Sequence, residues 1–331
     1  MTHADEDGSA KLVPAHSSTR ALKIIGDVWV MRILWDAFRG AKRFSDWSEI
    51  GGIPRPVLVD RLNRLLSAEV LETKPYSTRP VRHEYRLTER GRELWSYILS
   101  LWTWDQRWVV DPDRIQRQLR HHRCGKVCHA IICCNACGEP AQRSDIVEVR
   151  GPGATLEARL KPRWQRRSAV KESAPDTRDF SNELMRIVGD RWSTALLAAV
   201  TRGDGTFGDV QNRLHISSHL LSERLKELVA YEVMERVAYG AKPQRLRYRL
   251  TEKGEALLLS HWLLMRWGDR WLAGPEGPPL LVEHKCGAPF VAEVHCSECG
   301  GKLRPGNFSF EPDVTLQIFR GEGAAVAAEA G

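Results

Sequence analysis

The sequence lacks any long apolar run, and its opening stretch, MTHADEDGSAKLVPAHSS, is acidic and polar. A membrane-spanning helix needs about 20 consecutive apolar residues, and a secretory signal needs a basic segment followed by an apolar one. We therefore expect a cytoplasmic protein with no membrane partner. With 42% hydrophobic and 27% charged residues, the composition also excludes collagen-like, low-complexity and disulfide-miniprotein classes.

Signals of catalysis are missing as well. The chain contains no glycine-rich phosphate loop, nucleophile elbow or paired catalytic constellation. We therefore expect no enzyme activity. What the chain does contain is a formal net charge of +7, which favours a polyanionic partner, and 12 Trp beside only 8 Phe and 6 Tyr.

The chain contains an internal repeat. The segment IIGDVWVMRIL at Ile24 aligns with IVGDRWSTALL at Ile187, an offset of 163 residues (24 to 187). The same offset pairs YRLTERG at Tyr85 with YRLTEKG at Tyr248 without a gap. Similarity of this kind over a whole module indicates a duplication.

A second matched block follows at an offset of 162 residues (122 to 284). It pairs HRCG at His122 with HKCG at His284, and CNACG at Cys134 with CSECG at Cys296. Each repeat is therefore a large module followed by a small cysteine-rich segment. Residues 159–178 carry seven basic and two acidic side chains, which is typical of a linker.

These patterns divide the chain into seven predicted segments. They are a disordered N-terminus (1–16), a first large module (17–110), a Cys-rich zinc-ribbon-like segment (111–150), a basic linker (151–179), a second large module (180–275), a second Cys-rich zinc-ribbon-like segment (276–320) and a disordered tail (321–331).

Apolar spacing and capping residues predict the elements of each large module. Two short helices meet at Asp27, which is placed to cap the second, and Asp190 repeats this cap. A third helix ends near residues 51–52, and an amphipathic helix follows over 56–68, copied at 217–230. A hairpin turning at 77–80 and a long terminal helix capped by Thr88 complete the module. The predicted fold class is mainly α with small β wings: two winged helix-turn-helix domains, each with a cysteine-rich appendage.

A winged helix-turn-helix places one helix in the DNA major groove and a basic hairpin near the phosphates. The alternative for its arginines is a solvated helix face, and Arg61 and its counterpart Arg224 could pair within the module. The candidate DNA-binding residues are Arg55, Arg61, Asn63, Arg64, Lys74, Arg79 and Arg82 in the first copy, and Ser218, His219, Ser222, Lys226, Lys242, Arg245 and Arg247 in the second.

The GDxW start at Gly26, the FxD step at Phe44, the LxxRL helix at Leu58 and the YRLTE[RK]G segment resemble the HxlR-type winged-helix transcriptional regulators. The resemblance implies sequence-specific binding to double-stranded DNA and favours a repressor over an activator. Family members generally pair as homodimers through their terminal helices. Two copies in one chain therefore imply an internal pseudo-dimer, as a monomeric chain or as a further homodimer.

Tryptophans gather on the two terminal helices. Large aromatic surfaces usually seek a partner surface, although here they could instead close each module's own core. We predict a pseudo-dimer interface formed by Trp102, Trp104, Trp108, Trp267 and Trp271.

All eight cysteines lie in the two appendages, and clustered cysteines in a cytosolic chain favour metal over disulfides. We predict two structural zinc sites, each built within one copy, because zinc takes four such ligands in a tetrahedron. The sets are His122, Cys124, Cys134 and Cys137, and His284, Cys286, Cys296 and Cys299. The fourth ligand stays open, since His295, His121, Cys128, His129 or Cys133 could serve instead.

Three alternatives remain at this point. The cysteines could be reduced thiols without metal, or a redox sensor using the vicinal pair Cys133 and Cys134. One lobe could bind a protein partner or a small-molecule effector instead of DNA, as the less basic helix with His219 suggests.

Overall fold

The computed structural model describes residues 12–14, 16–50, 52–79, 81–109, 117–158, 180–240 and 245–311. The core of the predicted linker and the predicted C-terminal tail lie outside these residues. Buried side chains of both repeats form one contiguous core.

The first module contains the predicted helices and hairpin. Its elements are α1 (Ser17–Ile25), α2 (Val28–Phe38), the π-helical turn η1 (Asp46–Ile50), α3 (Arg55–Ser67), β2 (Leu71–Thr78), β3 (Val81–Leu87), α4 (Glu89–Arg92) and α5 (Trp95–Trp108). Strands β2 and β3 pair antiparallel as a wing.

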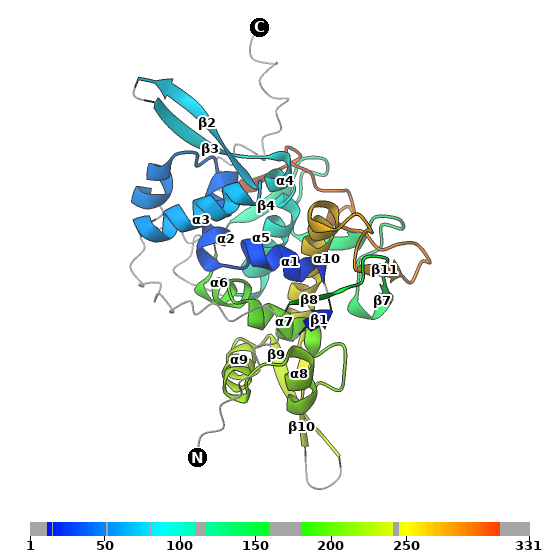
Figure 1. Cartoon of the computed structure of the whole chain (residues 1–331). Coiled ribbons are helices and arrows are strands. Elements are labelled where there is room, and N and C mark those ends of the chain that lie inside the picture. Colours follow the sequence, from blue (N-terminus) through cyan, green and yellow to red (C-terminus); the bar gives the residue numbers. More distant parts are fainter. Residues whose placement is uncertain are drawn as a thin grey trace, which may run out of the picture.

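The second module repeats this order. Its elements are α6 (Asn182–Val188), α7 (Arg191–Ala199), α8 (Phe207–Leu214), α9 (Ser218–Ala230), β9 (Met234–Tyr239), β10 (Arg245–Leu250) and α10 (Glu252–Leu272). In Figure 1 the β2–β3 wing projects at the top and the β9–β10 wing at the bottom, with α5 and α10 between them.

The predicted capping residues are confirmed. The Asp27 side chain accepts hydrogen bonds from the backbone N–H groups of Trp29 and Val30, and Asp190 accepts from that of Ser193. Thr88 caps α4, and its counterpart Thr251 caps α10. These side chains satisfy backbone donors that a helix leaves open at its start.

Two elements differ between the copies. The third helix of the first copy is the five-residue turn η1, whereas its counterpart α8 has eight residues. The single long terminal helix predicted after Thr88 is divided into α4 and α5, while α10 runs uninterrupted for 21 residues. The division falls at Glu93 and Leu94, which keep right-handed helical angles, so it is a local tightening of the helix.

The two cysteine-rich segments are interwoven, contrary to the prediction of two separate appendages. The first supplies β4 (Gln118–His121), β5 (Val127–Cys128), β6 (Ala130–Cys134) and β7 (Ile146–Arg150), with the short turn η2 (Arg143–Asp145), and the second supplies β11 (Leu280–His284), β12 (Ala292–Cys296) and β13 (Phe308–Glu311). Strand β6 pairs with β12, β4 with β13, and β7 with β11, all antiparallel.

This crossed pairing follows an approximate two-fold symmetry. In the β6–β12 pair Ile132 lies opposite Val294, its own counterpart in the repeat. His121 lies opposite Phe308 in one outer pair, and His284 lies opposite Ile146 in the other. Each segment therefore completes the sheets of the other.

The helical modules also exchange contacts. Helix α10 of the second repeat packs against α1 and α5 of the first, and α2 packs against α6. The buried Asp105 of α5 accepts hydrogen bonds from the backbone N–H of Ser181, at 2.7 Å, and from its hydroxyl, at the start of α6. Reciprocally, Asp269 of α10 accepts from the hydroxyl of Ser17 at the start of α1, and burial raises the pKa of this carboxyl to about 6.

One strand pair changes the predicted boundaries. Leu12–Pro14, inside the predicted disordered N-terminus, forms β1 and pairs with β8 (Leu156–Ala158), which lies inside the predicted linker. Backbone hydrogen bonding between the two segments therefore orders part of each.

Candidate functional site

Two groups of four side chains lie at the ends of the crossed strands β4, β6, β11 and β12. The first group contains His121, Cys124, Cys296 and Cys299, and the second contains Cys134, Cys137, His284 and Cys286. Within each group the candidate ligand atoms all lie within 4.8 Å of one another. Each group has three thiols and one imidazole, and each could hold a metal ion.

The distances in the first group match a tetrahedral ion. Zinc bonds of about 2.3 Å to sulfur and 2.0–2.1 Å to nitrogen place tetrahedral ligand atoms about 3.5–3.8 Å apart. The Sγ atoms of Cys124 and Cys296 are 3.9 Å apart, and His121 Nδ1 lies 3.6 Å from Cys124 Sγ. His121 Nδ1 also lies 3.3 Å from Cys299 Sγ. These are the edges expected of a tetrahedron.

The second group has the same chemistry. Cys137 Sγ lies 3.5 Å from Nδ1 of His284, whose ring stacks on that of Phe290 with centroids 5.8 Å apart. The His284 side chain lowers the pKa of the Cys286 thiol to about 7. Thiolates are the form in which cysteine binds metal, and the lowered pKa makes this one thiol easier to deprotonate.

Tight turns present the thiols. In the two CxxCG segments the N–H of Gly138 donates to the carbonyl of Cys134, and that of Gly300 to the carbonyl of Cys296. Both glycines have positive φ, 77° and 66°, which a residue with a Cβ adopts only with strain. The glycine after each CxxC is therefore required by the turn that points both thiols to one side.

Seven of the eight predicted ligands lie in these groups, but the grouping within one copy is wrong. Each group joins one histidine and cysteine pair to the CxxC pair of the other repeat. The exception is His122, which is exposed, while the buried His121 faces the thiols.

One signal in the sequence favours His121, although it does not by itself decide between His121 and His122. The offset of 163 residues that holds along the winged module also pairs His121 with His284, and the offset becomes 162 only at Cys124, which pairs with Cys286. When His121 is paired with His284, the second repeat lacks one residue in the turn between its histidine and its cysteine. His121 and His284 occupy matching positions at the ends of β4 and β11.

The other side chains considered as fourth ligand lie outside both groups. Burial raises the pKa of the Cys128 thiol to about 12 and that of Cys133 to about 11. His295 Nδ1 is 2.9 Å from the carbonyl oxygen of Gly300, and His129 Nε2 is 3.4 Å from the Arg107 guanidinium.

The candidate DNA-binding residues of the first module lie on α3 and the β2–β3 wing. Leu58, Leu62 and Leu65 bury one face of α3. The exposed candidates are Arg55, Asn63, Lys74, Arg79 and Arg82, whereas Arg64 is half-buried.

The second module offers a similar surface, although its helix α9 is less basic than α3. On α9 and the β9–β10 wing the exposed candidates are Ser218, His219, Lys226 and Arg245. Ser222 is half-buried, and Arg247 is held over the Tyr239 ring at 4.2 Å. Lys242 lies outside the described residues.

Arg61 is engaged inside its module. Its guanidinium lies 3.0 Å from both carboxylate oxygens of the helix cap Asp27, whose side chain is 2% exposed. Arg224 repeats this ion pair with Asp190 at 2.6 Å. The pairing within the module, considered as the alternative for these arginines, is therefore what the structure shows.

Four of the five predicted interface tryptophans contact the other repeat. The indole N–H groups of Trp104 and Trp267 donate to the carbonyls of Lys253 and Arg90, both at 2.8 Å. The remaining contacts are those of Trp271 with Glu93 at 2.7 Å and of Trp102 with the Phe310 ring at 4.6 Å between centroids. Trp108 is partly buried and lies beneath the Arg107 guanidinium of its own helix.

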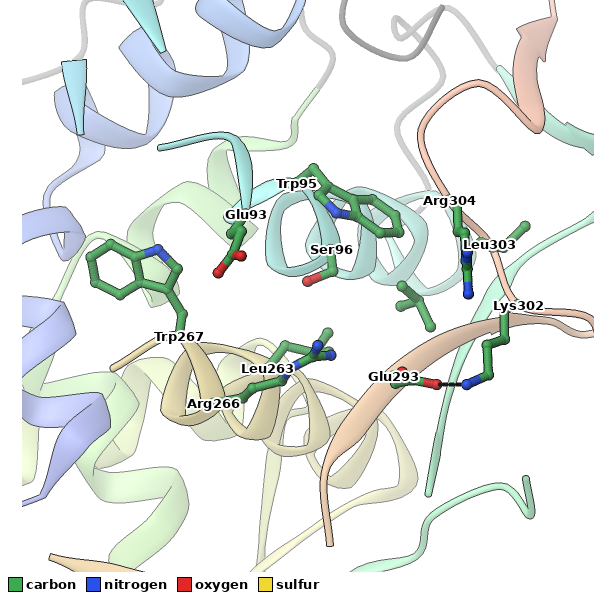
Figure 2. A pocket seen from close by; sticks show the side chains of 11 residues that line it. Glu93, Trp95, Ser96, Leu263, Arg266, Trp267, Glu293, Lys302, Leu303 and Arg304 are labelled. Atoms are coloured by element: carbon green, nitrogen blue, oxygen red, sulfur yellow. Dashed lines mark ion pairs between the residues drawn. The ribbon is translucent and has the colours of Figure 1, made fainter. Parts of the chain in front are cut away.

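A cavity of about 280 Å³ lies between α5, α10 and the second cysteine-rich segment. Trp95 and Ser96 line it from the first repeat, and Arg266 and Trp267 from α10. Figure 2 shows the ion pair of Glu293 with Lys302 on a further wall, at 2.6 Å. The lining therefore combines indole rings with charged groups.

None of the helices in the described part of the chain is both long and apolar enough to cross a bilayer.

Comparison with known proteins finds transcriptional regulators among the relatives of this chain. The chain is 40% identical over 134 residues to an HTH-type transcriptional regulator of Mycobacterium tuberculosis. This match covers 40% of this chain and 85% of the relative. It is 33% identical over 86 residues to the HTH-type transcriptional regulator YodB of Bacillus subtilis, covering 26% of this chain and 77% of YodB. The crystal structure of diamide-treated YodB matches 27% of this chain and 89% of that chain at 32% identity, with a TM-score of 0.23.

The model of the HxlR-like helix-turn-helix family matches residues 24–113 and 187–275, which is one region in each repeat. Together these regions make up more than half of the sequence. The chain therefore belongs to the HxlR-like helix-turn-helix family of transcriptional regulators.

Proposed function

We propose that this chain is a cytoplasmic transcriptional repressor that binds double-stranded DNA sequence-specifically as a single-chain pseudo-dimer. The observation that supports this proposal most strongly is the reciprocal packing of the two winged modules. Each terminal helix, α5 or α10, holds the start of the other repeat's first helix through a buried or half-buried aspartate. This packing supports a fixed mutual arrangement of the two winged modules within one chain.

In this mechanism α3 and α9 each enter a major groove, and the two wings contact neighbouring phosphates. The two helices present different side chains: Arg55 and Asn63 on α3, and Ser218, His219 and Lys226 on α9. We therefore expect an asymmetric operator with two different half-sites. Because the wings neutralise phosphates, binding weakens steeply with salt.

Charge reversal on either wing tests the paired mechanism. We expect Arg79→Glu and Arg245→Glu each to weaken binding of the full chain by at least about tenfold, because each replaces a phosphate-neutralising cation with an anion. The measurement is a gel-shift titration at fixed salt with DNA from the protein's own upstream region. The matched control is Arg150→Glu, which makes the same charge change at an exposed arginine of β7, a strand that Figure 1 shows at the side of the molecule, apart from both wings.

An effect of Arg79→Glu without one of Arg245→Glu would contradict the paired mechanism. That result would favour the second candidate function, in which one lobe holds a protein or small-molecule effector. The cavity between α5 and α10 supports this candidate, because its indole and charged walls suit a small polar ligand at the junction of both repeats.

We further propose that zinc occupies both clusters as a structural ion. Three thiolates and one imidazole are preferred zinc ligands, and four protein ligands leave no open position for a substrate. Elemental analysis of the purified full chain is expected to find two zinc ions per chain. A purified chain that contains no metal and takes up none from buffered zinc would contradict this assignment.

A further inference from the structure

We infer that both zinc ions are shared between the repeats, so that each ion cross-links the first half of the chain to the second. This inference rests on the proposed assignment of zinc. It concerns which residues bind each ion, and therefore what metal binding does to the arrangement of the two DNA-binding modules.

The composition of the clusters is the first observation. In the first cluster His121 and Cys124 come from the first repeat, and Cys296 and Cys299 from the second. In the second cluster the first repeat supplies the CxxC pair, Cys134 and Cys137, and the second repeat supplies His284 and Cys286. Among the residues that the structure describes, neither repeat alone contains a complete cluster of this kind.

The strand register is the second observation. Cys134 lies opposite Ala292, and Cys296 lies opposite Ala130, at the two ends of the central β6–β12 pair. The two CxxC turns therefore leave this pair in opposite directions. Each turn then meets the histidine of the other repeat, where β4 or β11 ends.

Because several ligands are buried, the crossed strand pairing is difficult to replace by a pairing within one repeat. His121, Cys134 and Cys296 are fully buried, and His284 is 3% exposed. Bringing Cys124 to Cys134 within one repeat would require β6 to separate from β12 and expose these side chains. The crossed arrangement is therefore the one in which metal ligation and strand pairing support each other.

A functional consequence follows for the DNA-binding modules. The cysteine-rich segments follow directly on α5 and α10, and Trp102 of α5 packs on Phe310 of the second segment. Ions that hold the crossed strands together also keep Phe310 against Trp102, and this contact fixes α5 against the second repeat. We expect metal loading to stabilise the mutual arrangement that places α3 and α9 on DNA.

Zinc content of paired variants of the full chain distinguishes the two ligand assignments. With shared ions, Cys124→Ser/Cys296→Ser removes two ligands of one cluster and leaves one zinc per chain. Cys124→Ser/Cys134→Ser damages both clusters and leaves none. If each ion were bound within one repeat, the two results would be exchanged: no zinc in the first variant and one in the second.

Further variants keep this test interpretable if one variant fails to fold. Cys124→Ser/Cys299→Ser and Cys124→Ser/Cys137→Ser repeat the comparison at other thiols, with circular dichroism to check folding. His122→Ala is the matched control and is expected to keep two ions, whereas His121→Ala is expected to keep one. The exchanged pattern would overturn the inference, while a wild-type chain without metal would overturn the zinc assignment itself.

Discussion

Removing metal from the full chain with a strong chelator is expected to lower its unfolding temperature by about 10 °C and to weaken operator binding. Structural zinc contributes about 10–16 kcal/mol to the folding of zinc-finger peptides. In this chain part of the crossed sheet remains held by backbone hydrogen bonds and buried side chains, so we expect a net loss of about 5 kcal/mol. At about 2 °C per kcal/mol for a protein of this size, the shift is about 10 °C.

The measurement is a thermal melt followed by tryptophan fluorescence, with and without chelator. Returning zinc in slight excess is expected to restore both the unfolding temperature and the gel shift. A chain depleted of metal that melts unchanged and binds its operator normally would show that the clusters need no ion for folding or for DNA binding.

Replacing Asp105 with alanine is expected to lower the free energy of unfolding by about 3 kcal/mol. The Asp105 carboxylate is fully buried and accepts from both the backbone N–H and the hydroxyl of Ser181. Its loss leaves buried donors unpaired, each at a cost of about 1–3 kcal/mol. It also weakens the cap of α6, because the same Ser181 hydroxyl accepts from the N–H of Leu184.

The reciprocal residue provides an internal comparison. Asp269 makes the corresponding bond to Ser17 but is only half-buried, so Asp269→Ala is expected to cost about 1 kcal/mol. Urea unfolding followed by tryptophan fluorescence measures both losses. Equal losses, or a larger one for Asp269→Ala, would contradict the role given to burial at Asp105.

Local signals made the winged modules predictable. Asp27 and Thr88 act through bonds to residues close in sequence, and the structure places both as expected. The predicted hairpin is also present, although β2 extends to Thr78 and β3 begins at Val81, inside the predicted turn. A large indole surface on a terminal helix needs a partner surface, which predicts Trp104 and Trp267 at the junction of the repeats. Both indole N–H groups donate across that junction.

The crossed pairing could not be predicted from either segment alone. A strand such as Ala130–Cys134 carries the same apolar pattern whether it pairs with a strand of its own segment or of the other. The change of offset between His121 and Cys124 was visible in the sequence, but a gap can be placed on either side of a doubled histidine. Packing in three dimensions decides which ring faces the thiols.

The contacts of arginines near the surface were equally hard to predict from the sequence. The periodicity of α3 separates its buried leucines from its polar side chains, yet it does not distinguish an arginine that faces solvent from one that pairs with a helix cap. Arg61 belongs to the second kind because the fold brings Asp27, 34 residues earlier, within hydrogen-bond distance.

The crossed clusters also set an order of events during synthesis of the chain. Cys124 leaves the ribosome long before its partner Cys296, which lies 172 residues later. Neither cluster has all its ligands until most of the second repeat has been made, so the first cysteine-rich segment leaves the ribosome before either set of ligands is complete. A nascent chain that stops after the first repeat has half of each cluster and cannot close either.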